Sequence, residues 1–319
     1  MTLMRPRATL TLDGRTLSSA EAALVRADVA LSVRGGHDSA TLLVWPDSKL
    51  ITAAAGSTLS IALGNQGEEE DVWSGEVTGV SAGADGFVID GLAATIALSR
   101  TRVSRVYVDQ SVADIVKDLA SDADIDEVEG DTSLTGYAVD NRRSVWTQLH
   151  ALAALVGAEL GSSASGGLRF VLPRTGSADT TLRYGADVLT WSGGSAPKPV
   201  PSSVAAFGAA SESGADQWHW LLREPAAAGG DGPTRVVAAF RTRDAAESMA
   251  NGLALRAARA AVHATLRVVG NPSLRPGDLV DVSDLPSGDL GTLRVLDVEH
   301  VLDGRTGFTT SLVVEGAGS

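Results

Sequence analysis

Five histidines are the first candidates for chemistry, because neutral imidazole binds metals and transfers protons near pH 7. None of them falls in a His-x-His or His-Glu-x-x-His spacing, which would hold a metal ion. His300 follows Glu299 at the end of a predicted strand, where we expect a surface or barrel-rim histidine. The sequence therefore predicts no metal site and no cofactor. The five residues are His37, His150, His219, His263 and His300.

The sequence also lacks the motifs of nucleophilic catalysis and of phosphate binding. The chain has no cysteine, which excludes disulfides, thiolate metal sites and thiol catalysis. It has no Gly-x-Ser-x-Gly elbow and no Gly-x-x-x-x-Gly-Lys-Ser/Thr loop. Ser192-Gly193-Gly194-Ser195 lies in a region rich in proline and glycine, so we expect a turn there. Carboxylates are abundant and a glycosidase pair can be distant in sequence, but no two of them stand out. We predict no catalytic residue.

A tryptophan pair is the remaining candidate for ligand binding. Trp218 and Trp220 flank His219 at a period of two, so both indoles would point to one side of a strand. Such a pair could stack on sugars or anchor a protein interface. Core packing is the simpler expectation in a chain with so few aromatics, and it also applies to Trp73 and Trp146.

The overall charge narrows the class of partner. A net charge of −13 and 44% hydrophobic residues indicate an acidic globular protein with enough apolar material for real cores. Sequence-specific nucleic-acid binding would require a basic surface, so we expect none. The chain starts without a signal peptide, and no run approaches the ~18 apolar residues of a membrane span. We therefore expect folding in a bacterial cytoplasm and no membrane segment.

Hydrophobic periodicity divides the 319 residues into three parts. Residues 1–98 read as antiparallel β structure, with alternation over residues 25–33, a return strand over 40–45, and strands near 58–63, 72–80 and 87–90. The acidic run Glu68-Glu69-Glu70-Asp71 is expected in a solvated loop between two strands.

Residues 99–185 change to the helical period. Ser111 can cap a helix whose stripe is Val112, Ile115, Val116 and Leu119. A second helix is expected after Ser144 and should end near Gly157. Strands near Glu159 and over residues 168–172 complete a compact α/β unit.

Residues 186–319 return to β structure around one helix. Thr242 can cap this helix, and Ala246, Met249, Ala250, Leu253 and Ala257 lie on one of its sides. Strands are expected over residues 264–269, 279–282, 292–300 and 308–315. The turn Leu274-Arg275-Pro276-Gly277 contains the Pro-Gly signature of a type II turn.

The two β parts contain the same ordered features, which predicts an internal repeat. Each has a glycine before a short strand (Gly56 and Gly277), an acidic loop, a longer strand, and a final strand that starts with Gly-Phe and ends with an acid and glycine. The predicted fold is therefore mainly β with an α/β insertion. In this prediction, two similar small β-barrels, residues 1–98 and 186–319, flank a small α/β domain of residues 99–185.

Three segments resemble the family of phage late control protein D and baseplate hub proteins. The run from Gly270 to Val280 (GNPSLRPGDLV) is similar to the family pattern Gly-x-Pro-x-Leu-x-Pro-Gly-Asp-x-Val. Residues 293–300 and 308–316 resemble its closing strands, and residues 108–116 resemble the start of its middle helical region. The agreement extends over most of the chain and is weakest in the first fifty residues.

This resemblance implies a structural role without enzymatic activity. Hubs of contractile phages and the N-terminal parts of type VI secretion spike proteins are implied to be homotrimers in which paired barrels form a pseudo-sixfold ring. Such a ring would join the hexameric inner tube to a trimeric spike and contact other baseplate proteins. Because the sequence ends at Ser319 without a spike domain, a separate spike protein is expected.

Two alternatives stay open from the sequence. A tail-associated protein that binds or degrades peptidoglycan would account for the α/β unit and for Trp218 and Trp220. A β-rich adhesin is the other, although the sequence starts without a signal peptide.

Overall fold

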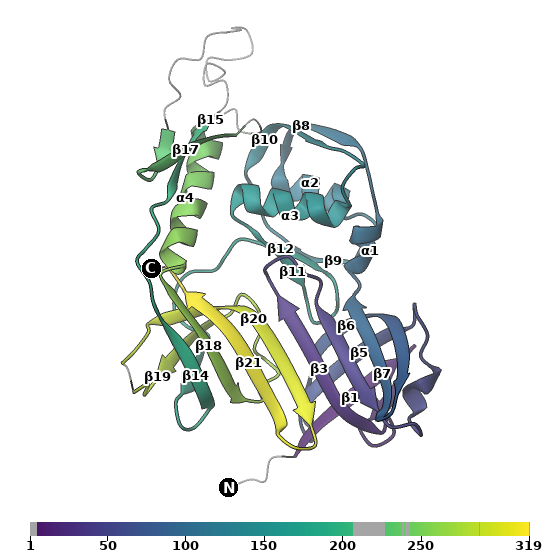
Figure 1. The fold of residues 1–319 in the computed structure, drawn as a ribbon. Coiled ribbons are helices and arrows are strands. Elements are labelled where there is room, and N and C mark those ends of the chain that lie inside the picture. The colour runs from purple at the N-terminus through teal and green to yellow at the C-terminus, as the bar shows by residue number, and fades with distance from the viewer. Residues whose placement is uncertain (1–4, 207–226, 238, 240–242, 287, 319) are drawn as a thin grey trace.

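The computed structural model describes residues 5–206, 227–237, 239, 243–286 and 288–318. Its ribbon has two layers: a large β layer in the lower half of Figure 1 and a layer with all four labelled helices above it. Within the described residues, no helix has the length and apolar character needed to cross a membrane.

The lower layer is one sheet of thirteen strands. Its main path runs β14-β18-β21-β20-β3-β4-β7-β6-β5-β1-β2, while β19 pairs with β20 and β13. From the first part of the chain come β1 Pro6–Leu12, β2 Arg15–Ser18, β3 Leu24–Ser32, β4 Ser39–Val44, β5 Thr58–Asn65, β6 Glu68–Gly83 and β7 Gly86–Ala93. From the last part come β13 Thr180–Arg183, β14 Val188–Ser195, β18 Val262–Val269, β19 Leu279–Ser283, β20 Thr292–Asp303 and β21 Gly307–Gly316.

The junction between the two β parts is the antiparallel pair β3–β20. Alternation places Ala27, Val29 and Leu31 of β3 in the core, opposite Val298 and other residues of β20. A single hydrophobic core therefore contains residues of both parts. The strand pairing gives one continuous sheet and does not show two closed barrels, so the barrel geometry stays a prediction.

The upper layer combines helices with three small sheets. The helices are α1 Ile96–Arg100, α2 Val112–Leu119, α3 Val145–Val156 and α4 Arg243–Arg259, and a 3-10 turn, η1, covers Lys49–Thr52 in the lower layer. The small sheets pair β8 Arg105–Ser111 with β10 Ser133–Val139; β11 Glu159–Ser162 with β12 Leu168–Val171 and β9 Ile125–Val128; and β15 Ser202–Ala206 with β16 Ala227–Gly229 and β17 Gly232–Val237.

The predicted caps of α2 and α3 are confirmed. The Ser111 side chain accepts a hydrogen bond from the N–H of Asp114, and the Ser144 side chain accepts one from the N–H of Thr147. Gly157 ends α3 in the left-handed conformation with φ of 76°. All four apolar residues of the predicted α2 stripe are buried. Local capping chemistry and helical periodicity therefore determine these two elements.

Helix α4 contributes to the core of the upper layer, although it lies in the last part of the chain. Ala246, Met249 and Ala250 are buried there together with the apolar faces of α2 and α3. Its predicted cap, Thr242, lies outside the described residues, as do Trp218, His219 and Trp220.

Two predicted loops are strands instead. The acidic run of residues 68–71 forms the start of β6 and pairs with the end of β5, because the turn needs only the two residues between them. Ser192–Ser195 belongs to β14 and pairs with Val262–Thr265 of β18. In both cases the cross-strand hydrogen-bond ladder outweighs the low strand propensity of acidic residues and glycine.

The internal repeat is visible in the strand pairing. Five strands of the first part have the spatial order β3-β4-β7-β6-β5, and five of the last part have the order β14-β18-β21-β20-β19. The chain visits both sets in the same sequence, and the five strands in each set pair antiparallel throughout.

The irregularities of the two repeats also coincide. The pair β3–β4 has a bulge after Leu24, and β14–β18 has one after Val188. The longer strands β6 and β20 have bulges after Val77 and Val295. Bulges re-aim strands at defined positions, so their agreement fixes the alignment of the repeats.

This alignment changes one predicted correspondence. With the bulges superimposed, Phe87 matches Thr310, because both lie opposite the matching residues Val44 and Val268. The predicted match of Gly86-Phe87 with Gly307-Phe308 is therefore offset by two residues. The hairpin β20–β21 is longer at its tip than the hairpin β6–β7.

Candidate functional site

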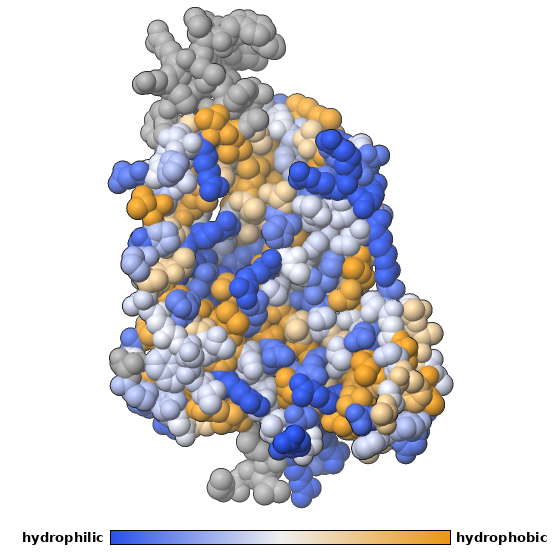
Figure 2. Space-filling view, in the orientation of Figure 1, coloured by the Kyte–Doolittle hydropathy of each residue, from blue (hydrophilic) through white to orange (hydrophobic). Residues whose placement is uncertain are grey.

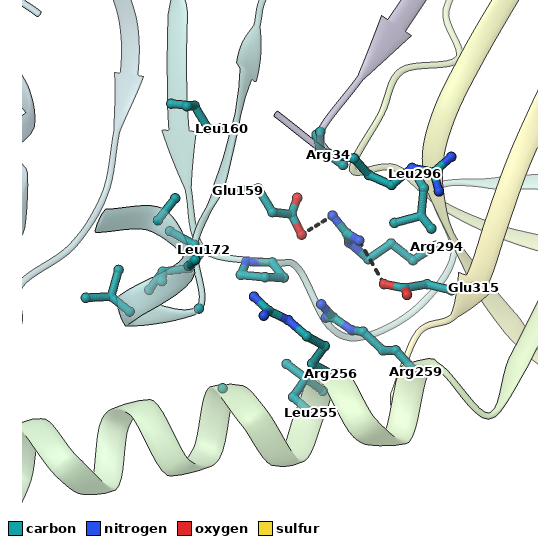
Figure 3. A pocket seen from close by; sticks show the side chains of 18 of the residues that line it. Arg34, Glu159, Leu160, Leu172, Leu255, Arg256, Arg259, Arg294, Leu296 and Glu315 are labelled. Carbon is teal, nitrogen blue, oxygen red and sulfur yellow. Dashed lines mark hydrogen bonds and ion pairs between the residues drawn. The ribbon is translucent and has the colours of Figure 1, made fainter. Parts of the chain in front are cut away.

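A large cavity lies at the junction of the two layers. It has a volume of about 610 Å³ and is lined by residues of α3, β11, α4 and β20. Figure 3 shows charged side chains from both walls of this cavity, with Arg294 and Glu315 on the sheet and Arg256 and Arg259 on α4. On the face in Figure 2, hydrophobic and hydrophilic patches are interspersed over both halves of the molecule.

Arg294 of β20 is the central charge of this junction. Its side chain is 2% exposed, and its guanidinium forms ion pairs with Glu159 of β11 and with Glu315 of β21, the latter at 3.1 Å (Figure 3). Burial raises the pKa of Glu159, and the nearby Arg294 charge opposes this rise. The cluster joins the upper layer to the sheet through one shared cation.

Arg259 adds a second buried cation at the end of α4. Its Nε donates a hydrogen bond to the carbonyl oxygen of Ala317 at 3.1 Å, and its Nη2 donates to that of Arg174 at 2.9 Å. The side chain therefore ties the helix to the C-terminal segment and to the segment that leads into β13. Together, Arg259 and Arg294 connect three segments that are remote in sequence. These are residues 159–174, helix α4, and the last two strands with the C-terminal segment.

Asp38 forms a separate polar contact between the layers. This residue is 3% exposed and lies between β3 and β4. Its carboxylate accepts hydrogen bonds from the N–H of Ser32 at 2.8 Å and from the hydroxyl of Ser162 on β11 at 2.9 Å. Burial raises the pKa of Asp38 to about 7.

Helix α3 also contacts the loop before Asp38. The indole Nε1 of Trp146 donates to the carbonyl oxygen of Gly35 at 2.9 Å. The ring of His37 lies 4.2 Å from that of Trp146, between centroids, and its nitrogens contact the hydroxyls of Thr95 and Ser99. Burial lowers the pKa of His37 to about 4, so this contact is neutral at physiological pH.

The contacts of Arg294 with Glu159 and Glu315 are typical of structural ion pairs. Glu159 and Glu315 contact the same guanidinium, whose single positive charge is shared between the two carboxylates and which lies between them. A general acid would need a carboxyl group that faces a substrate and can exchange its proton there. The geometry therefore supports a role in holding the layers together.

The four histidines in the described part of the chain lie on separate elements or loops, and His300 is not at the surface. It is completely buried in the sheet, with Nδ1 3.0 Å from the hydroxyl of Thr310, and burial lowers its pKa to about 3. The prediction of a surface or rim position is wrong because His300 lies on the core-facing side of β20, the side of Val298, and opposite the buried residues Val29 and Thr310. Among the described residues, no group of three or more His, Asp or Glu side chains could hold a metal ion.

Core packing is confirmed for Trp73 and Trp146, which are 1% and 7% exposed. The residues of the junction were missed from the sequence. One signal was present: Arg294 interrupts an apolar run between Leu293 and Val295 on a predicted strand. A charge inside such a run indicates a buried pair, although the sequence does not identify the partner.

No protein-family model and no curated protein matches this sequence. Solved structures do match over nearly the whole chain. A 43 kDa tail protein of prophage MuSo2 from Shewanella oneidensis has a TM-score of 0.73 at 15% identity and covers 98% of this chain and 99% of its own. The chain has the fold of phage tail proteins.

Two further structures support this tail-protein fold. A tail protein from Neisseria meningitidis has a TM-score of 0.71 at 15% identity, with coverage of 98% and 96% of the two chains. An Escherichia coli component of the type VI secretion system, described as similar to the T4 tail proteins gp27 and gp5, has a TM-score of 0.56 at 14% identity and covers 91% and 73%. The resemblance to hub and tail proteins is thus confirmed for the fold.

Proposed function

We propose that this chain is a structural baseplate hub subunit of a phage tail or contractile injection system. In this role it is a homotrimeric adaptor that joins the hexameric inner tube to a separate trimeric spike and performs no catalysis. It is made in the bacterial cytoplasm and becomes part of the tail or injection particle. We further propose that residues 1–98, 99–185 and 186–319 act as its three functional units.

The internal repeat carries this proposal. Two equivalent five-strand sets in one chain give a trimer six similar surfaces, which is the number that a hexameric tube presents. The full-length likeness to tail proteins, with 98% of the chain covered, supports the same assignment. The ion-pair junction supports a mechanical role, because it ties the helical layer rigidly to the sheet.

Sedimentation and binding measurements test the proposal. We expect a species of about 98 kDa, three times the chain mass of 32.7 kDa, that binds the tube protein and the spike protein encoded beside it. A monomer at all concentrations that binds neither partner would contradict the proposal. A peptidoglycan pull-down and a turbidity assay test the cell-wall alternative, whose tryptophan pair lies outside the described residues. Binding or lysis in these assays would favour that alternative.

A further inference from the structure

Several strand edges of the described sheet have no strand partner, and two of these edges belong to β14 and β6. β14 pairs with β18 on one edge and is the last strand of the sheet path on the other. β6 pairs with β5 only as far as Glu76, so its segment Thr78–Gly83 has β7 on one edge and no strand on the other. Unpaired edges expose rows of backbone N–H and C=O groups that another chain can bind.

Neither edge carries the charged residues or proline that usually protect an edge against such binding. Soluble proteins place charged residues, especially lysine, or proline on exposed edge strands. Neither Thr78–Gly83 nor Val188–Ser195 contains a charged residue or a proline. Both segments are largely exposed, and they lie on opposite sides of the lower layer in Figure 1. This combination is typical of edges that pair in an assembly.

The chain itself contains a junction of the required kind. β3 pairs with the C-terminal part of β20, from Ser32 opposite Asp297 to Arg26 opposite Asp303. In the repeat alignment, β3 corresponds to β14, and β20 corresponds to β6. The two free edges are therefore the exact counterparts, in the other repeat, of the two edges joined inside the chain.

Resting on the trimeric hub proposed above, we infer that β14 of one copy pairs antiparallel with Thr78–Gly83 of β6 in a second copy. The bulges set the register, because Val80 matches Val298 and Ser195 matches Leu31, which lie opposite each other in the chain. Val80 then faces Ser195, Ser81 faces Gly194 and Ala82 faces Gly193 of the second copy.

Side-chain burial agrees with this register. Val80 is 37% exposed, whereas its counterpart Val298 is 1% exposed beneath β3. Pairing would cover the edge that holds Val80, and the small residues of both strands allow close approach.

The contact joins two different edges, so it is head-to-tail. Each copy therefore offers its β14 edge to one neighbour and its β6 edge to the other. Head-to-tail contacts form closed rings when the rotation between copies closes. In a ring of three copies, β3–β20 junctions inside a chain would alternate with β14–β6 junctions between chains. The sheet would then be continuous around the ring.

Engineered disulfides test the register, since the chain has no cysteine of its own. The test variant combines Ser81→Cys with Gly194→Cys, where an added Cβ meets nothing within 4 Å. Directly opposed residues have Cα atoms within about 5.5 Å, which suits a disulfide. Mild oxidation should give two-chain and three-chain bands on a non-reducing gel, with most of the protein cross-linked.

Two matched variants calibrate this result. Ala30→Cys with Glu299→Cys joins opposed residues of the internal junction, so it should oxidise fully without any multi-chain band. Ser81→Cys with Ser192→Cys shifts the register by two residues, to about 7–8 Å, and should cross-link at least fivefold less.

The outcomes separate this inference from the proposed function. A trimer by mass in which the test variant does not cross-link overturns the edge pairing and leaves the trimeric hub intact. Equal cross-linking in the shifted variant overturns the register. A monomer at all concentrations overturns both the pairing and the trimer.

Discussion

Gly56 and Gly277 occupy the same position in the two repeats. Their φ angles are 93° and 96°, and their N–H groups donate hydrogen bonds of 2.8 Å to the carbonyl oxygens of Val77 and Val295. The residue after each glycine accepts a bond back from the same valine at 2.9 Å. In the second repeat this turn is Arg275–Asp278, where the Pro-Gly signature predicted a type II turn.

Replacement of either glycine by alanine should destabilise the protein. A φ near +95° lies in a region that L side chains rarely adopt, and such strain costs about 1–3 kcal/mol. Gly56→Ala and Gly277→Ala should therefore each lower the free energy of unfolding by a similar amount in urea titrations. Gly136→Ala is the control, because its Cβ meets open space. Wild-type stability in either turn variant would contradict the equivalence of the two turns.

Loss of the Arg294 charge should be severe. Arg294→Met leaves Glu159 buried without its cation, and breaking a buried pair in this way costs about 3–5 kcal/mol. The matched control is Arg100→Met, since Arg100 pairs at 3.0 Å with Glu76, the counterpart of Arg294 in the first repeat. That pair is exposed at the surface, so its loss should cost less than about 1 kcal/mol.

A rescue experiment distinguishes charge from packing at this junction. Adding Glu159→Gln and Glu315→Gln to Arg294→Met removes the uncompensated carboxylates and should recover more than half of the lost free energy of unfolding. Absence of any recovery would show that the ion pairs are not what makes Arg294 important.

Stability should respond to the ionisation of Asp38. The pKa of this carboxyl is about 7 in the folded chain against an ordinary value of 3.8, so from about pH 4 to about pH 7 the folded state holds a proton that the unfolded state has lost. Ionisation therefore costs stability as the pH rises through this window. Asp38→Asn keeps an oxygen for the Ser32 N–H, and its stability advantage over wild type should grow from pH 5 to pH 7 and then level off.

Asp126→Asn is the control for this pH series. Hydrogen bonds from Ser163 and Ser165 lower the pKa of Asp126, so its contribution changes only as the pH falls below its ordinary value. The titration of His37 and His300 cancels in both comparisons, because every variant retains these residues. A constant difference between Asp38→Asn and wild type from pH 5 to pH 8 would contradict the raised pKa.

Local signals explain which parts of the fold could be predicted. Ser111 and Ser144 identified the starts of α2 and α3, because a cap and its helix are a few residues apart in sequence. Alternation identified β3 for the same reason. These elements depend on information within one turn of helix or one strand.

Most of the features that could not be predicted depend on pairing between residues that are far apart in sequence. Ser32 donates a hydrogen bond to Asp297 across 265 positions of sequence, and nothing near either residue indicates this partner. The single sheet, the burial of His300 and the Arg294 cluster all depend on such distant contacts. The repeat was detectable from glycine spacing, but its correct register required the bulges.

The most direct test of the ring is its rotational symmetry in electron microscopy of the purified protein. Averages viewed along the ring axis should have threefold symmetry with a strong sixfold component, because equivalent repeats would alternate around the ring. Averages that show single copies, or a threefold particle without the sixfold component, would contradict the central claim that one chain supplies two equivalent units of the ring.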